Sequence, residues 1–160
     1  MKLIIIIALF LSCSPPATTY YFVRHAEKAC EDCNTCGLSA AGMLRSQALA
    51  DYLERKGIDT IFASQCLRTQ HTAQPLSGSL SEPVSIYQTN QLTSFIQKLK
   101  TIPSRQVLVV GHSNQIPVMI DSLTHEKIFI GEDEYDNLYI VKKKGLFTTV
   151  TNLKASKYGN

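Results

Sequence analysis

The chain has 160 residues, of which 44% are hydrophobic and 18% charged, and this length and composition predict one globular domain and exclude a disordered chain. Lys and Arg outnumber Asp and Glu by 16 to 13. This excess is too small to indicate a nucleic-acid partner, and no basic block or RNA-type aromatic motif accompanies it. The five cysteines are an odd number, so one of them has no partner if the others pair.

The N-terminal segment has the pattern of a signal for export. Residues 3–11 form an unbroken apolar run behind a short basic start. The run is far shorter than the ~20 residues that a membrane-spanning helix needs, but it suits the core of a secretory signal peptide. Its end, Phe10-Leu11-Ser12-Cys13, resembles a bacterial lipobox, in which the cysteine is lipidated and becomes the new N-terminus.

This resemblance predicts a lipoprotein-type signal peptide over residues 1–12, a lipid anchor on Cys13, a proline-stiffened tether over 13–19 and one domain over 20–160. We therefore expect an exported bacterial protein that faces the periplasm or the cell surface and contacts the membrane only through its anchor. A plain signal peptide cut elsewhere and a buried N-terminal strand are the alternatives. The sequence indicates no oligomeric state.

Signals for strands and helices alternate along the rest of the chain. Runs rich in β-branched and aromatic residues predict strands, and apolar residues at three- and four-residue steps predict helices. The expected strands cover 18–23, 58–63, 84–87, 106–110, 138–142 and 146–151, and the expected helices cover 39–56, 67–76, 91–100 and 116–123. This alternation predicts a three-layer α/β/α sandwich with a mostly parallel sheet.

The first expected helix has the clearest boundaries. Ser39 is a suitable N-cap and Gly57 a suitable stop. The apolar side chains are expected to form one buried stripe, made of Ala41, Leu44, Ala48, Leu49, Tyr52 and Leu53.

Charged and imidazole side chains follow three expected strands at the point where each strand ends. Arg24 and His25 follow the first strand, Arg68 lies shortly after the second, and His112 follows the apolar strand at 106–110. Ligands in open α/β sheets bind at the carboxyl ends of the strands, so adjacent parallel strands would bring these side chains into one pocket. Two guanidiniums can bind a phosphate or carboxylate through forked hydrogen bonds. Two imidazoles can act as nucleophile or acid–base groups.

Four segments carry a known combination of motifs. They are Arg24-His25-Ala26-Glu27 after the first strand, Leu38-Ser39-Ala40-Ala41-Gly42 at the start of the first helix, residues 64–73 with Arg68 and Thr72, and residues 107–113 with His112. Together they resemble the histidine phosphatase superfamily, also called phosphoglycerate mutase-like, in the short branch that includes phosphohistidine phosphatases. The sequence carries no GxSxG elbow, GxGxxG loop or Walker loop that would indicate another chemistry.

The resemblance implies a phosphoric monoester hydrolase that acts on a small phosphorylated substrate by double displacement, with no cofactor and no metal. His25 would attack phosphorus and become a phosphohistidine, which water then hydrolyses. Arg24, Arg68 and His112 would hold the phosphoryl oxygens, where fixed cations stabilise the transition state. A non-catalytic phosphate- or anion-binding envelope lipoprotein on the same fold is the alternative function.

The proton donor to the leaving group is the least defined part of this expected site. Larger members of the family carry an acid after the second arginine block, but here Glu82 is the only carboxylate between Arg68 and His112. We take Glu27 as the candidate donor. The sequence has no insertion that would build a mutase lid, so a phosphatase is favoured over a mutase.

The remaining cysteines, Cys30, Cys33, Cys36 and Cys66, form a second group near the expected pocket. Because exported thiols are commonly oxidised, two disulfides that pin the loop after His25 are the expected arrangement, with the pairing left open. A zinc or iron–sulfur site on the same sulfurs, in a metal- or redox-linked envelope protein, and free thiols are the alternatives.

Overall fold

The computed structural model describes residues 17–32, 35–103, 105–145 and 147–154. The strands are β1 (Ala17–Arg24), β2 (Thr60–Ser64), β3 (Val84–Tyr87), β4 (Gln106–Gly111), β5 (Asn137–Lys144) and β6 (Phe147–Lys154). The helices are α1 (Ala40–Leu53), α2 (Leu67–Leu80), α3 (Leu92–Thr101) and α4 (Ile116–Thr124), with short 3-10 turns η1 (Glu54–Lys56) and η2 (Thr89–Gln91). Each expected strand and helix has its counterpart.

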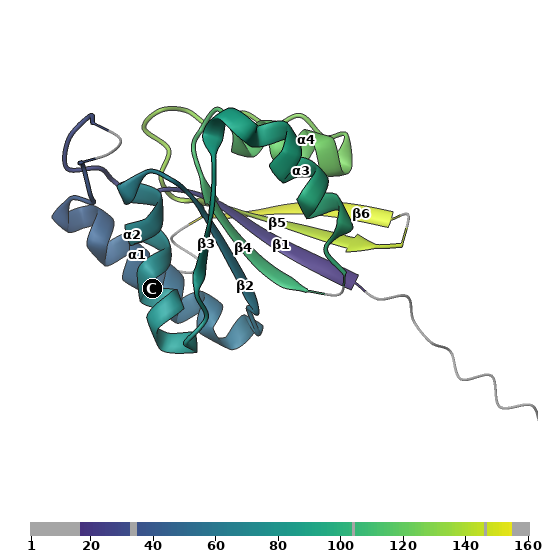
Figure 1. The fold of residues 1–160 in the computed structure, drawn as a ribbon, viewed down its shortest axis with the longest axis horizontal. Helices are drawn as coiled ribbons and strands as arrows, with labels where there is room; N and C mark the ends of the chain where they lie inside the picture. Colours follow the sequence, from purple (N-terminus) through teal and green to yellow (C-terminus); the bar gives the residue numbers. More distant parts are fainter. Residues whose placement is uncertain (1–16, 33–34, 104, 146, 155–160) are drawn as a thin grey trace, which may run out of the picture.

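A six-stranded sheet in the order β3-β2-β4-β1-β5-β6 forms the centre of the molecule. The strands β1 to β4 are parallel to one another, and β5 and β6 run antiparallel at one edge. Helices α1 and α2 cover one face of the sheet, and α3 and α4 cover the other (Figure 1). The predicted three-layer sandwich with a mostly parallel sheet is confirmed.

The strand sequences explain why both faces are covered. In β1, Tyr20 and Phe22 belong to the core under α3 and α4, whereas Tyr21 and Val23 belong to the core under α1 and α2. The apolar residues of β4 divide in the same way, because successive side chains in a strand point to opposite faces. Near-continuous apolar strands of this kind are typical of a parallel sheet buried on both faces.

The buried face of α1 differs from the predicted stripe. Ser39 caps the helix as expected, since its hydroxyl accepts a hydrogen bond from Gly42 N at 3.1 Å. Leu53 is buried as expected, but Leu44 is 75% exposed. Gly42 is buried instead, and a Cβ at this position would lie 2.2 Å from the backbone oxygen of Glu27. The missing side chain lets the helix approach the loop after β1.

Helix α2 extends past its predicted end and contains Pro75. A proline inside a helix removes one backbone donor and clashes with the preceding turn, which is why the sequence predicted an early end. Ala73 and Leu76, on either side of Pro75, are fully buried against the sheet. Their packing offsets the local cost and holds the last turns in place.

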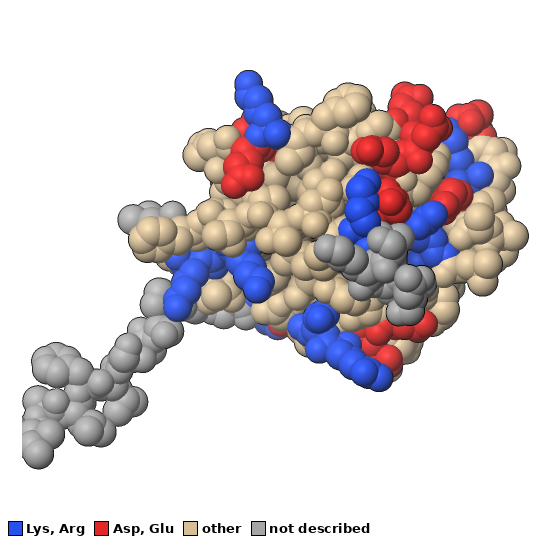
Figure 2. Space-filling model, turned by 180° about the vertical axis from the view of Figure 1, so that it is seen from behind, with Lys and Arg blue, Asp and Glu red and all other residues tan. Residues whose placement is uncertain are grey.

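Strand β1 enters the sheet at the end that lies opposite the carboxyl ends of the parallel strands. Strand β1 begins at Ala17, so residues 17–19, which we expected to form the tether, belong to the sheet. Residues 142–144, all lysines, pair with them, and Figure 2 shows basic side chains at this end of the molecule. The predicted signal peptide and Cys13 lie outside the described residues. No helix in the described ranges is long and apolar enough to cross a membrane.

Replacing Gly42 with alanine should destabilise the fold, because the new Cβ meets backbone atoms of Glu27. We expect the free energy of unfolding, measured by urea denaturation, to fall by about 1–3 kcal/mol, the usual cost of overpacking. Gly78→Ala in α2 is the matched control. Nothing lies within 4 Å of its Cβ position, and alanine in a helix is more stable than glycine by roughly 0.5–1 kcal/mol. Equal effects of the two substitutions would contradict a close contact at Gly42.

Candidate active site

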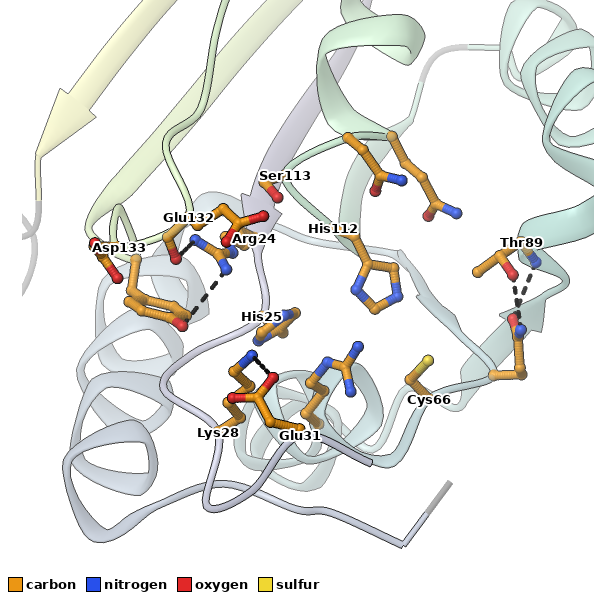
Figure 3. Close-up of a pocket in the computed structure, with 15 residues that line it drawn as sticks. Arg24, His25, Lys28, Glu31, Cys66, Thr89, His112, Ser113, Glu132 and Asp133 are labelled. Atoms are coloured by element: carbon orange, nitrogen blue, oxygen red, sulfur yellow. Dashed lines mark hydrogen bonds and ion pairs between the residues drawn. The ribbon is translucent and has the colours of Figure 1, made fainter. Parts of the chain in front are cut away.

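The carboxyl ends of three neighbouring strands meet at one edge of the sheet. In the parallel pairing of β1 with β4, Arg24 lies opposite Gly111, and β2 flanks β4 on its other side. Arg24 and His25 come from β1 and its end, Arg68 from the first turn of α2, and His112 from the turn after β4. All four side chains line one pocket of about 680 Å³ (Figure 3). The sequence-predicted cluster is therefore brought together.

His25 is almost fully buried, and its Nδ1 lies 2.8 Å from the carbonyl oxygen of Ala26. Because a carbonyl oxygen only accepts, Nδ1 carries the proton and Nε2 of the neutral ring carries the lone pair. Burial, the largest influence, lowers the pKa of His25 to about 3. The hydrogen bond to Ala26 opposes this effect, and the charges of His112 and the two arginines add to it. The ring is therefore neutral at pH 7 and holds a lone pair suited to nucleophilic attack.

A chain of hydroxyl groups fixes the tautomer of His112. Its Nε2 lies 2.9 Å from Ser64 Oγ, which in turn lies 2.8 Å from Thr69 Oγ1. The hydroxyl hydrogen of Thr69 goes to the backbone oxygens of Ser64 and Cys66, at 3.0 and 2.7 Å. Ser64 must then donate to Thr69, and His112 Nε2 must donate to Ser64. Burial first, and the two arginines second, lower the pKa of His112 to about 4.

The two arginines differ in how their nitrogens are engaged. Arg68 Nε and Nη1 are buried and have no hydrogen-bond partner among the described residues. Arg24 Nη1 donates to the carbonyl oxygens of Gly131 and Glu132, and its guanidinium lies 4.2 Å from the ring centroid of Tyr135. Arg24 Nε is also buried and has no hydrogen-bond partner among the described residues. Because an unpaired buried polar group is costly, these nitrogens indicate an anion site with Arg68 as its main donor.

Thr72 gives a physical reason for the spacing in the block that contains Arg68. Its hydroxyl accepts a hydrogen bond from Ala26 N at 2.9 Å and donates to the backbone oxygen of Arg68 at 2.7 Å. Residues four apart lie on the same side of a helix. Thr72 therefore ties the turn that holds Arg68 to the residue whose carbonyl orients His25.

Glu27, the candidate proton donor, does not line the pocket. Its carboxylate accepts hydrogen bonds from Arg45 of α1 at distances between 2.6 and 3.0 Å. Burial raises the pKa of Glu27, but the contacts with Arg45 outweigh burial and the net pKa is lowered. The carboxylate is ionised and paired with Arg45, so the structure does not bring Glu27, the expected proton donor, together with the residues of the pocket.

The pocket also contains residues that the sequence did not single out. Glu132, Asp133 and Tyr135 come from the segment between α4 and β5. Tyr135 Oη lies 3.5 Å from Arg24 Nη2, and Figure 3 shows Glu132 and Asp133 on one side of His25 with Thr89 on the other. No motif marks this segment. Its run of acidic residues before the antiparallel strand is the only signal that could have indicated it.

A disulfide between Cys30 and Cys36 closes the loop after His25. The expected disulfide chemistry is confirmed for this pair, and these two sulfurs are therefore not available to ligate a metal. Cys66 lines the pocket and is disulfide-bonded as well, while Cys33 lies outside the described residues. No cluster of potential metal ligands occurs in the described ranges.

Solved structures share this fold. The protein histidine phosphatase SixA complexed with tungstate matches with a TM-score of 0.70 and 17% identity, covering 87% of this chain and 98% of that chain. The alpha-ribazole phosphatase from Shigella flexneri matches with a TM-score of 0.67 and 16% identity, covering 85% and 96%. The phosphoserine phosphatase from Entamoeba histolytica, in complex with 3-phosphoglyceric acid, matches with a TM-score of 0.70 and 12% identity, covering 89% and 100%. The fold is phosphoglycerate mutase-like.

The family model of the histidine phosphatase superfamily (branch 1) matches residues 20–93. This range contains the Arg24-His25 motif, the start of the first helix and the block with Arg68. Over this range the match agrees with the resemblance that these motifs carry. No curated protein matches the chain.

The low pKa values of the two pocket histidines predict a stability that depends on pH. An imidazole in the unfolded chain has a pKa of about 6.5, whereas the pKa of His25 is about 3 and that of His112 about 4 in the folded chain. At pH values between the unfolded pKa and the folded pKa of each histidine, the unfolded state binds more protons than the folded state. The free energy of unfolding therefore falls as the pH falls. The loss reaches at most about 1.4 kcal/mol per pH unit for each histidine.

Urea denaturation between about pH 7 and pH 5 measures this dependence. We expect the double variant His25→Gln/His112→Gln to show a clearly smaller loss of stability on acidification than the wild type. An identical pH dependence in both proteins would mean that the two imidazoles are not buried in neutral form.

Proposed function

We propose that the chain is a phosphatase that hydrolyses a phosphomonoester through a phosphohistidine on His25. The observation that carries the proposal is a neutral, oriented imidazole beside buried guanidinium nitrogens of Arg68 that lack partners in the described ranges. The family match and the phosphatases among the structural neighbours support hydrolysis. They do not favour the alternative of a non-catalytic anion-binding protein.

In the first step, the lone pair on His25 Nε2 attacks phosphorus, and the bond between phosphorus and the leaving oxygen breaks. The leaving oxygen keeps the electron pair of that bond and takes up a proton from solvent. The Nδ1 proton stays on the ring, where Ala26 O accepts its hydrogen bond. Arg68 donates through Nε and Nη1 to the phosphoryl oxygens. Because these donors are already in place, they stabilise the transition state without reorganising.

His112 can donate a hydrogen bond to the phosphoryl group in this step only when its ring is protonated. Its Nε2 hydrogen is committed to Ser64, so only Nδ1 is left to contact a phosphoryl oxygen. Nδ1 donates only when the ring is protonated, and a phosphate dianion beside the ring favours that charged form. We propose that substrate binding recruits His112 as the second donor to the phosphoryl group.

In the second step, water attacks phosphorus, the bond between nitrogen and phosphorus breaks, and inorganic phosphate leaves. His25 recovers its lone pair, and the water proton that is not retained by phosphate passes to solvent. In both steps, positively charged side chains of the protein stabilise the negative charge on the phosphoryl oxygens.

We also propose that the protein is exported and anchored through a lipid on Cys13. The apolar run, the lipobox-like sequence around Cys13 and the Cys30–Cys36 disulfide support this location, since disulfides persist in oxidising compartments.

Metabolic labelling with a radioactive fatty acid checks the anchor. The wild-type chain, expressed in a bacterium, should incorporate the label and fractionate with membranes. Cys13→Ser should lose the label, whereas Cys66→Ser should keep it. Labelling that survives in Cys13→Ser would remove the lipid anchor from the proposal.

The phosphatase mechanism is checked with a small aryl phosphate. Wild-type protein should release the phenol and accumulate an acid-labile phosphoenzyme after rapid quenching, because a phosphohistidine is the intermediate. His25→Ala should form no phosphoenzyme and lose at least about 100-fold in kcat, the smaller end of what loss of a key catalytic group costs. His125→Asn is the control, since His125 is exposed and has a φ of 62° that asparagine tolerates. Equal turnover by wild type and His25→Ala would overturn the mechanism.

A further inference from the structure

The last part of the segment between α4 and β5, residues 131–136, forms one side of the pocket mouth, and its carboxylates divide into two groups. Glu134 and Asp136 lie 4.0 and 3.1 Å from Lys154 Nζ on β6. Glu132 and Asp133 are exposed and line the pocket. They form no ion pair with the part of the chain that the structure describes. Among the described residues, these two carboxylates are the acidic groups that face the pocket without a cationic partner.

The other charges of the pocket leave Glu132 and Asp133 uncompensated. Lys28 and Glu31 neutralise each other on another wall, where their charged atoms lie 2.5 Å apart. The two guanidiniums of the floor would be compensated by the phosphoryl dianion of a substrate. Glu132 and Asp133 then face the leaving group of the substrate.

The backbone holds this acidic pair in a fixed place relative to the floor. Arg24 donates to the carbonyl oxygens of Gly131, at 2.8 Å, and of Glu132. Tyr135, at the other end of the same turn, lies under the Arg24 guanidinium, 4.2 Å from ring centroid to guanidinium carbon. A positioned group binds a ligand at lower entropic cost than a mobile one.

We infer that the substrate is a phosphomonoester whose leaving group carries a positive charge, such as an alkylammonium, an inference that rests on the proposed phosphatase function. Glu132 and Asp133 attract such a group and repel a leaving group that bears a second carboxylate or phosphate. Because both carboxylates are exposed, the preference is modest and weakens with salt. We expect about three- to ten-fold at low ionic strength.

The experiment compares two phosphonates that cannot be hydrolysed and that differ in charge, 2-aminoethylphosphonate and propylphosphonate. Each is measured as a competitive inhibitor of aryl phosphate hydrolysis by the full chain. The proteins are the wild type, the double variant Glu132→Gln/Asp133→Asn, and Glu126→Gln. Glu126 belongs to the same segment but does not line the pocket, so its substitution removes a charge without changing the mouth.

In the wild type, the inhibition constant should be lower for the aminoethyl compound than for the propyl compound, and added salt should narrow the difference. The double variant should shift the ratio of the two constants by about three- to ten-fold toward the propyl compound, and Glu126→Gln should keep the wild-type ratio. The same ratio in the double variant and the wild type overturns the inference. If the aryl phosphate is not hydrolysed at all, the proposed function fails, and calorimetric titration of the two phosphonates then decides the charge preference by itself.

Discussion

The parallel pairing of β1 with β4 determines where the two imidazoles lie. Because Arg24 stands opposite Gly111, His25 and His112, each one residue beyond its strand, come within 5.3 Å between ring centroids. The backbone N–H of His25 also donates to Gly111 O at 3.0 Å, which extends the ladder to the reactive residue. A slip of one residue would move these groups apart by about 3.3 Å and turn the side chains of β1 to the opposite face of the sheet.

The same few groups control both the charge state of the pocket and its shape. The arginines help to keep both imidazoles neutral, so the free pocket holds fixed positive charge and available lone pairs together. An anion that binds this state also stabilises the folded chain, because it binds the folded form alone. Arg24 adds a second function, since its contacts with Gly131 and Glu132 connect the pocket floor to the acidic side of the mouth.

The sequence predicts the sheet and the pocket floor well, because both depend on local patterns and on one rule of α/β topology. Apolar strands and the residues at their ends can be seen directly, and parallel neighbours then bring Arg24, Arg68 and His112 together. The sequence could not place Glu27, because its partner Arg45 lies on a helix that packs closely against the backbone of Glu27 at Gly42. Contacts of this kind are set by packing between distant segments and leave no local pattern.

The segment that carries Glu132, Asp133 and Tyr135 is a different case. Its place over the pocket depends on the reversal of the chain from α4 into the antiparallel strand β5, beside β1. Neither propensity nor a motif fixes the path of such a connection. The residues that we propose to govern substrate choice are therefore those that the sequence alone identified least.

Strand β1 has a consequence for the reach of the protein. It enters the sheet at Ala17, opposite the lysines of β5, and its eight residues end at the pocket, a run of about 25 Å. An anchor at Cys13, as we propose it, would attach the chain to a membrane at the end of β1 that lies farthest from the pocket. The point of attachment and the pocket would then stand at opposite ends of the same strand, so that the anchor leaves the pocket mouth uncovered.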